Sequence, residues 1–301
     1  MSASPAAPGP NPATGAVARA IGAVPPPGLL IISIVSIQLG AAVAIELFPV
    51  LGPVGVASLR LAFSAVLLAA VTRRTIGRSA RRHLPSLLLY GAILGTMNLC
   101  FYGAIARIPL GIAVAIEFVG PLGLAAIMSR RPRDFAWIAL AVFGIVLLTP
   151  QIGTELDPLG VALAGAAGLC WAGFAVMSQR VGRAVPGNAG LAMAMVVAAL
   201  IVLPVELAVG SFGRLDFGLL VAALAVAILS TALPLSLEFE ALRRMSARSY
   251  GILVTMEPAV AATVGAILLG QAMGPQGVLA VACVTTAALG VTVSDRGEAG
   301  G

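Results

Sequence analysis

The chain has 301 residues, of which 59% are hydrophobic and only 10% are charged. Soluble globular domains carry about 25% charged residues, so this composition excludes a soluble protein and predicts a membrane protein. The net charge is +6, and all 18 basic residues are arginines. Without a lysine the chain cannot form a nucleotide-binding loop that ends in Gly-Lys, and we expect no ATPase site of its own.

We predict an all-α membrane protein with ten transmembrane helices. Only helices or closed barrels satisfy every backbone group in lipid, and the apolar runs of this chain do not alternate as barrel strands do. Residues 1–28, rich in Pro, Ala and Gly, are expected to form a disordered N-terminal tail, and residues 294–301 a C-terminal tail. Since a helix needs about 20 apolar residues to cross the membrane, the predicted spans are residues 29–47, 54–72, 87–106, 110–128, 135–150, 159–177, 189–209, 217–239, 250–269 and 275–293.

Three polar residues in the first three spans are candidates for a substrate site. Gln38 lies in the first span, Arg60 in the second and Asn98 in the third. Arg60 is the only cation inside the predicted spans. It either extends to the lipid headgroups or presents its guanidinium fork to a carboxylate of a substrate or of the protein.

The fourth and ninth spans repeat one motif around a carboxylate. Residues 111–122 read GIAVAIEFVGPL and residues 250–258 read YGILVTMEP, so that Gly, Ile, Val and Glu recur 140 residues apart. Glu117 and Glu257 each lie about 10 Å from the start of their span, at 1.5 Å per residue. Ionisable groups at such depth are costly and mark functional sites, although common descent of two halves also explains a shared structural hydrogen bond.

Glu238 in the eighth span and Glu240 just after it must have different roles. They are two residues apart, about 200° around a helix, so they cannot both face one cavity. Glu240 is spaced to pair with Arg244, which leaves Glu238 as the candidate that faces the cavity. The 140-residue offset also relates Glu238 to Asn98.

The offset superposes the ninth span on the fourth, so the repeating unit has five helices and must be inverted in the membrane. We predict two inverted repeats, residues 29–150 and 159–293. Such repeats build many secondary transporters, with the substrate near the bilayer midplane. With the N-terminus inside, fifteen of the eighteen arginines fall on the cytoplasmic side, where basic loops are enriched. Both termini are therefore expected in the cytoplasm, and the high pI reflects membrane orientation rather than nucleic-acid binding.

The chain resembles the drug/metabolite transporter superfamily of EamA type, and within it the bacterial inner-membrane threonine/homoserine exporters. The resemblance runs through SIQLGAAVAIELFPVLG, LRLAF, PLGIAVAIEFVGPL, SRRPRDFAW, AVAILSTALPLSLE and TMEPAVAA. It implies a carrier of two EamA domains that exports small neutral amino acids across the cytoplasmic membrane by exchange with protons. Members usually carry Gly-Glu after the ninth helix. This chain has Gly270-Gln271 instead, which puts a gating or proton role at that position in doubt.

The residues and the resemblance together predict one substrate site, with Glu117 as the proton-coupling group because protons entering from outside meet it first. Glu257 is expected to meet the ammonium group of the substrate. The predicted site residues are Gln38, Arg60, Asn98, Glu117, Glu238 and Glu257.

Two other functions stay open: a multidrug or other metabolite exporter of the same superfamily, and a membrane scaffold that transports nothing. Aromatic residues make up only 5% of the chain, which argues against aromatic cages for organic cations. An enzyme is not expected, because the predicted spans contain no Asp, His or Lys for a catalytic dyad. No cofactor or metal is expected either, since the three cysteines lie in separate spans and His83 is the only histidine. The expected partners are an amino acid, protons and membrane lipid, with a homodimer left open.

Overall fold

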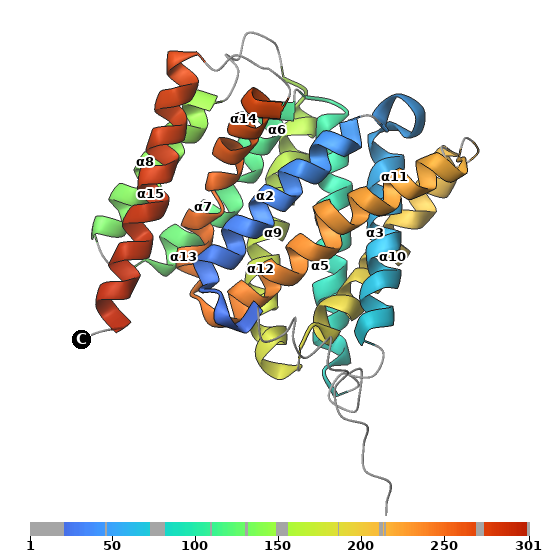
Figure 1. Cartoon of the computed structure of the whole chain (residues 1–301), viewed down its shortest axis with the longest axis horizontal. Coiled ribbons are helices and arrows are strands. Elements are labelled where there is room, and N and C mark those ends of the chain that lie inside the picture. The colour runs from blue at the N-terminus through green and yellow to red at the C-terminus, as the bar shows by residue number, and fades with distance from the viewer. Residues whose placement is uncertain are drawn as a thin grey trace, which may run out of the picture.

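The computed structural model describes residues 21–45, 47–72, 82–108, 110–129, 132–148, 156–185, 187–210, 213, 215–268 and 274–299. These residues form an all-helical bundle and contain no strand (Figure 1). In chain order the helices are α2 (Pro26–Ile45), α3 (Phe48–Thr72), α5 (Leu84–Ile105), α6 (Leu110–Glu117), α7 (Val119–Met128), α8 (Pro132–Leu148), α9 (Pro158–Ala184), α10 (Ala189–Val209), α11 (Phe217–Ala227), the π-helical turn η2 (Ile228–Ala232), α12 (Leu233–Arg244), α13 (Ala247–Leu253), α14 (Met256–Leu268) and α15 (Pro275–Ala299).

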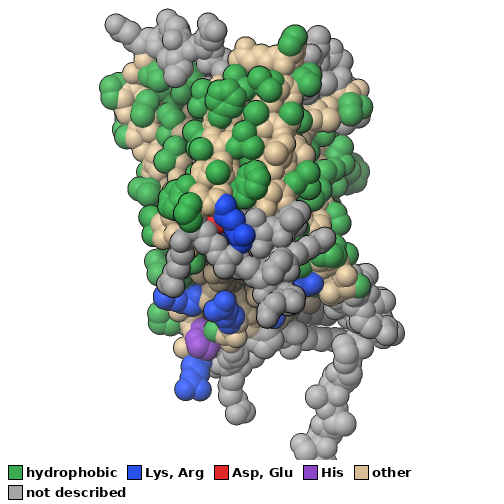
Figure 2. All heavy atoms as spheres, turned by 90° about the vertical axis from the view of Figure 1, so that its left-hand side faces the viewer, with side chains coloured by type: hydrophobic (Ala, Val, Ile, Leu, Met, Phe, Trp, Pro, Cys, Tyr) green, Lys and Arg blue, Asp and Glu red, His purple; other side chains and the backbone are tan. Residues whose placement is uncertain are grey.

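The described residues include five segments long and apolar enough to cross a membrane. They are Val54–Thr72, Leu84–Ile105, Pro158–Ala184, Ala189–Ala208 and Phe217–Arg244, and shorter apolar helices cover Pro26–Ala41, Ile112–Met128 and Pro275–Gly290. Figure 2 shows hydrophobic side chains over the side of the molecule, with arginine and histidine side chains gathered toward its lower end. The start of α2 and the end of α15 lie at that same end in Figure 1. An apolar flank with one basic end is the surface expected of a membrane protein.

Three of the predicted spans are divided into shorter segments. The fourth span consists of α6 and α7, the eighth of α11, η2 and α12, and the ninth of α13 and α14. The helix count among the described residues therefore exceeds ten and does not by itself establish a ten-helix inverted repeat. The ends also differ from the predicted ones, because α2 and α15 each extend into a segment assigned to a tail.

Proline explains all three divisions. A proline has no N–H to bond the carbonyl four residues earlier, and its ring clashes with that carbonyl. Pro121, Pro234 and Pro258 follow the three interruptions, and the carbonyls that lose their partners belong to Glu117, Ser230 and Val254. The chain adjusts by shifting its bonds: the Glu257 N–H donates to the Val254 carbonyl at 3.0 Å, three residues back instead of four.

Small residues bring the helices close together. A Cβ atom on Gly91 of α5 would lie 2.4 Å from Val197 Cβ of α10, and one on Gly120 of α7 would lie 1.8 Å from the Gly168 carbonyl oxygen of α9. Because lipid supplies no hydrophobic drive between helices, close backbone approach is a main source of association in membranes. The Gly91-x-x-x-Gly95 motif of the third span thus serves the α5–α10 contact.

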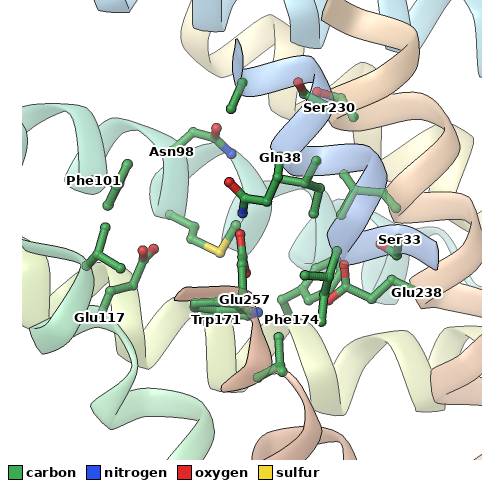
Figure 3. Close-up of a pocket in the computed structure, with 18 of the residues that line it drawn as sticks. Ser33, Gln38, Asn98, Phe101, Glu117, Trp171, Phe174, Ser230, Glu238 and Glu257 are labelled. Carbon is green, nitrogen blue, oxygen red and sulfur yellow. The ribbon is translucent and has the colours of Figure 1, made fainter. Parts of the chain in front are cut away.

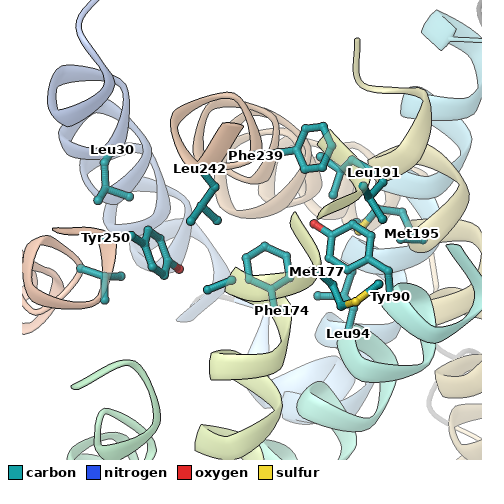
Figure 4. Packing of buried hydrophobic residues seen from close by; sticks show 14 of the residues in the cluster. Leu30, Tyr90, Leu94, Phe174, Met177, Leu191, Met195, Phe239, Leu242 and Tyr250 are labelled. Atoms are coloured by element: carbon teal, nitrogen blue, oxygen red, sulfur yellow. The ribbon is translucent and has the colours of Figure 1, made fainter. Parts of the chain in front are cut away.

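Aromatic rings fill the core between α5, α9 and α12. Tyr90 stacks on Phe174 with ring centroids 5.5 Å apart and on Phe239 with centroids 6.3 Å apart (Figure 4). The Tyr90 hydroxyl is fully buried and shares a 2.7 Å hydrogen bond with Ser178 Oγ, which satisfies both groups. Phe174 also reaches the wall of the central cavity, so this packed core forms one side of the candidate site.

Candidate functional site

A cavity of about 380 Å³ lies in the middle of the bundle, at the level of the three helix interruptions. It receives side chains from both halves of the chain, including the α6–α7 junction, η2 and the start of α14. The structure brings all six predicted site residues together in its wall: Gln38, Arg60, Asn98, Glu117, Glu238 and Glu257.

Glu117 and Glu257 face the cavity from the two divided spans. Glu117 is the last residue of α6 and is 9% exposed, and Glu257 is the second residue of α14 and half-buried. Figure 3 shows the Glu117 carboxylate directed into the cavity and the Gln38 amide directed toward Glu257. Each carboxylate interacts electrostatically with Arg60. Neither makes a side-chain hydrogen bond to another described residue, so both are available to a ligand.

Arg60 is held in the cavity by Asn98 rather than extended to the headgroups. Its Nη2 donates to Asn98 Oδ1 at 3.2 Å, and the Asn98 amide is oriented by its own donation to the Leu94 carbonyl at 2.9 Å. The buried Nε of Arg60 has no hydrogen-bond partner in the described part of the chain. The guanidinium fork therefore retains donors for an incoming carboxylate.

Glu238 belongs to a hydrogen-bonded chain of three side chains, in which Glu238 and Tyr250 are buried and Trp171 is partly buried. Trp171 Nε1 of α9 donates to the Tyr250 hydroxyl at 2.8 Å, and that hydroxyl donates to Glu238 Oε1. The indole of Trp171 also packs on Phe118, with ring centroids 5.0 Å apart. The residue after Glu117 is thus in contact with the network that holds Glu238, so the two carboxylates are structurally linked through α9.

Three residues that contribute to the site were missed in the sequence. Tyr250 immediately precedes the repeated motif but lies at the predicted end of a span, where tyrosine usually marks the membrane interface. Ser230 and Thr231 lie in the cavity wall on η2. The available signal was Pro234, which predicts a disturbed helical turn four residues upstream.

The remaining acidic residues of the spans lie outside the cavity wall or outside the described residues. Glu240 pairs with Arg243 at 2.8 Å, so the predicted pairing with Arg244 is wrong. Arg244 instead donates to the carbonyls of Ile21 and Val24 and ties the start of the described chain to α12. Glu206 is fully buried in α10, away from the cavity. Glu46 and Gln271 lie outside the described residues.

A buried ion pair lies at the basic end of the bundle. Arg248 of α13 donates to Asp134 of α8 at 2.8 Å, and the Asp134 side chain is completely buried. In the described ranges no group of three or more His, Cys, Asp or Glu side chains is arranged to hold a metal ion.

The EamA-like transporter family matches residues 158–293, which cover the second predicted repeat. The chain is 44% identical over 272 residues to the threonine/homoserine exporter RhtA of Escherichia coli (strain K12), covering 90% of this chain and 92% of that protein. It is 43% identical, with the same coverage, to RhtA of Salmonella typhimurium (strain SL1344). The uncharacterized transporter YwfM of Bacillus subtilis (strain 168) is 25% identical over 57% of this chain and 59% of its own length.

A solved crystal structure shares the fold, with a TM-score of 0.74 at 18% identity over 89% of this chain and 96% of the other. The relatives are exporters and transporters by name, which confirms that the protein is not an enzyme. At 44% identity over nine tenths of its length, the chain belongs to the EamA-like transporter family, as its sequence resemblance indicated.

Proposed function

We propose that this protein exports small neutral amino acids of the threonine and homoserine type across the cytoplasmic membrane in exchange for protons. One observation carries the proposal: a single cavity contains Arg60, suited to a carboxylate, and carboxylates suited to an ammonium group. An amino acid carries these two charges on adjacent groups. The names of the RhtA relatives support the substrate class.

The charge balance of the cavity supports exchange between substrate and proton. Glu117, Glu238 and Glu257 share the wall with one guanidinium, so full ionisation would leave two excess negative charges in a buried space. Uncompensated buried charge is strongly unfavourable. A proton neutralises one carboxylate, whereas a zwitterionic substrate leaves the net charge unchanged but pairs its ammonium group with that carboxylate while Arg60 binds the substrate carboxylate. A proton and the ammonium group cannot occupy the same carboxylate at once, so the proton and the substrate compete. This competition is the basis of antiport.

The cavity dimensions favour a small ligand. Ligand pockets range from about 300 to 1,000 Å³, and 380 Å³ is near the lower limit. Four aromatic residues in the wall, Phe101, Phe118, Trp171 and Phe174, favour the rival function of an exporter for organic cations. The three carboxylates, however, require a ligand with strong polar groups as well as apolar surface.

The helix contacts support the inverted repeat. In the proposed repeat, α2 corresponds to α9, α3 to α10, α5 to the α11–α12 segment, α6–α7 to α13–α14, and α8 to α15. When each helix is replaced by its counterpart, the contact of α5 with α9 becomes that of α12 with α2, and the contact of α10 with α5 becomes that of α3 with α11. All four contacts occur. The pairs α3–α10, α7–α13 and α8–α15 convert into themselves and also occur. Contacts of this kind are expected of a pseudo-two-fold axis in the membrane plane, with alternating access around a central site.

Counterflow in proteoliposomes tests the proposed substrate class. Purified protein should exchange labelled threonine for unlabelled threonine or homoserine. A proton gradient directed into the vesicles should drive net movement of threonine in the opposite direction. The other amino acids and a quaternary ammonium dye are tested as substrates in the same assay. Exchange of the dye but of no amino acid would move the assignment to multidrug export, and the absence of any exchange by correctly inserted protein would favour a scaffold.

Cysteine labelling tests the proposed orientation, with both termini cytoplasmic. In a background without Cys100, Cys170 and Cys283, Gly213→Cys should react with an impermeant reagent from outside and Gly22→Cys only from inside. A Cβ atom at either glycine meets no neighbour within 4 Å, so neither substitution should disturb the fold. Labelling of both positions from the same side would contradict the predicted topology.

A further inference from the structure

Several hydroxyl groups inside the helices of this protein are satisfied by their own backbone. Ser236 Oγ donates to the Ala232 carbonyl at 2.6 Å, and Thr263 Oγ1 donates to the Ala259 carbonyl at 2.8 Å. A bond to the carbonyl four residues earlier is the common solution for serine and threonine in an apolar helix. A buried hydroxyl that does not use it requires another partner.

The π-helical turn η2 is supported by hydroxyls from neighbouring helices. Ser36 Oγ of α2 donates to the Leu229 carbonyl at 2.7 Å, and Ser33 Oγ donates to the Pro234 carbonyl at 3.0 Å. From α3, Ser64 Oγ donates to the Ala227 carbonyl at 3.0 Å. These bonds satisfy backbone groups around the turn and fix its position against α2 and α3.

The hydroxyls of η2 itself are left without partners. Ser230 is 8% exposed and Thr231 is 2% exposed, and neither side-chain oxygen has a hydrogen bond among the described residues. Both residues line the cavity, and in Figure 3 Ser230 lies across it from Glu117. A buried hydroxyl without a hydrogen bond costs about 1–3 kcal/mol. Ser230 Oγ lies against Gly40 of α2. Because both residues line the ligand cavity, a turn about the Cα–Cβ bond brings either hydroxyl to a ligand that supplies the missing bond.

Building on the amino-acid export proposed above, we infer that Ser230 and Thr231 form the subsite for a hydroxyl group on the side chain of the substrate. The two charged ends of an amino acid are matched elsewhere in the wall, by Arg60 and by the carboxylates. A hydroxyl both donates and accepts, as do Ser230 and Thr231, so a substrate hydroxyl can complete the bonding of both. The subsite thereby gives a place to the hydroxyl that threonine and homoserine have in common.

The subsite acts by excluding analogues that lack the hydroxyl. Valine has the shape of threonine and norvaline that of homoserine, but each presents a methyl group where the substrate presents an oxygen. Either would bury Ser230 and Thr231 against carbon and leave both hydroxyls unsatisfied. A site that bonds a substrate hydroxyl rejects the analogue without it far more strongly than an apolar pocket rejects a change of one methyl group.

Counterflow of matched substrate pairs tests the subsite. The ratio of kcat/KM for threonine over valine, and for homoserine over norvaline, should be at least about tenfold in the wild type. Thr231→Val and Ser230→Ala should each lower both ratios about 2- to 10-fold, the effect of one hydrogen bond, mainly by slowing the hydroxylated substrate. Thr231→Ser keeps the oxygen and should retain the wild-type ratios.

Ser58→Ala is the matched control, because Ser58 Oγ is also buried without a partner in the described residues but lies outside the cavity wall. It should leave both ratios unchanged. Threonine transport with ratios unaltered in every Ser230 and Thr231 variant overturns the subsite while the proposed export stands. If the wild type transports no amino acid, the proposed export and the subsite both fall. If Thr231→Val does not reach the membrane, Thr231→Ser and Ser230→Ala decide between the same outcomes.

Discussion

The two halves of the protein share the motif Gly-Ile-x-Val-x-x-Glu but interrupt it at different points. In the first half, Glu117 ends α6, so the carboxylate precedes the break. In the second half the helix is interrupted at Val254 and Thr255, so Glu257 follows the break and belongs to α14. The reason is the proline, which lies four residues after Glu117 but immediately after Glu257. The two equivalent glutamates thus lie on opposite sides of the helix break.

The backbone around the two carboxylates is also held differently. Gly168 of α9 lies directly against Glu117, and a Cβ at Gly168 would come within 2.5 Å of the Glu117 carbonyl oxygen. Gly251 of α13 does not contact Glu257 in this way but packs on the Pro121 carbonyl of α7, at 2.3 Å from its hypothetical Cβ. Helix α7 is therefore clamped between α9 and α13. The backbone at Glu117 is thus packed closely against α9, whereas Gly251 in the second half packs on α7 and not on Glu257.

The largest expected effect separates the two carboxylates. Glu→Gln keeps the shape but abolishes titration, so Glu117→Gln should eliminate accumulation driven by a proton gradient while exchange of substrate continues. Glu257→Gln should instead raise the KM for threonine in both assays, because it removes a charge that meets the ammonium group. Gradient-driven uptake and counterflow, each measured across pH, distinguish the two. Wild-type behaviour of both variants with unchanged pH profiles would make the carboxylates structural.

The next effect tests the clamp on α7. Gly120→Ala places a Cβ 1.8 Å from the Gly168 carbonyl oxygen, where only movement of backbone can relieve the clash. Overpacking typically costs about 1–3 kcal/mol, so we expect lower abundance in the membrane and a lower melting temperature. Gly165→Ala on α9 is the control, since nothing lies within 4 Å of its Cβ. The stability of both variants is measured by a fluorescence-based melt in detergent. Equal melting temperatures would show that α7 is not held by this contact.

The repeat allowed the paired carboxylates to be predicted from the sequence, whereas the interruptions required the structure. Apolar runs long enough to span a membrane indicated most of the helices, and identical residues at a constant offset singled out Glu117 and Glu257. The π-helical turn was not visible in this way. Ser230 and Thr231 look like the residues that bond their own helix, as Ser236 does. Whether a hydroxyl lacks that bond depends on the local path of the backbone, and a sequence pattern does not reveal this path.

A smaller effect, about tenfold, is expected from the network of the second half. Tyr250→Phe removes the hydroxyl that joins Trp171 to Glu238. Glu238 loses a donor in a buried position, and hydrogen bonds to carboxylates are among the stronger ones in proteins. We expect a lower kcat with a changed pH profile, because the network includes a titratable group. Tyr102→Phe is the control, since Tyr102 does not line the cavity. A loss of abundance with a normal pH profile would assign Tyr250 to packing alone.

The smallest effect concerns how the first half positions its cation. Asn98 orients Arg60 through one bond of 3.2 Å, so Asn98→Ala should raise the KM for threonine only about 2- to 5-fold, as expected for the loss of a single neutral hydrogen-bond acceptor. Asn98→Asp should raise the KM further, because a carboxylate at this position competes with the substrate for the guanidinium. Asn188→Ala is the control, since Asn188 begins α10 without a side-chain capping bond. The informative result is which of the two Asn98 variants has the higher KM. If Asn98→Asp lowered the KM, its carboxylate would merely stabilise Arg60, and the guanidinium would have a structural role instead of binding the substrate.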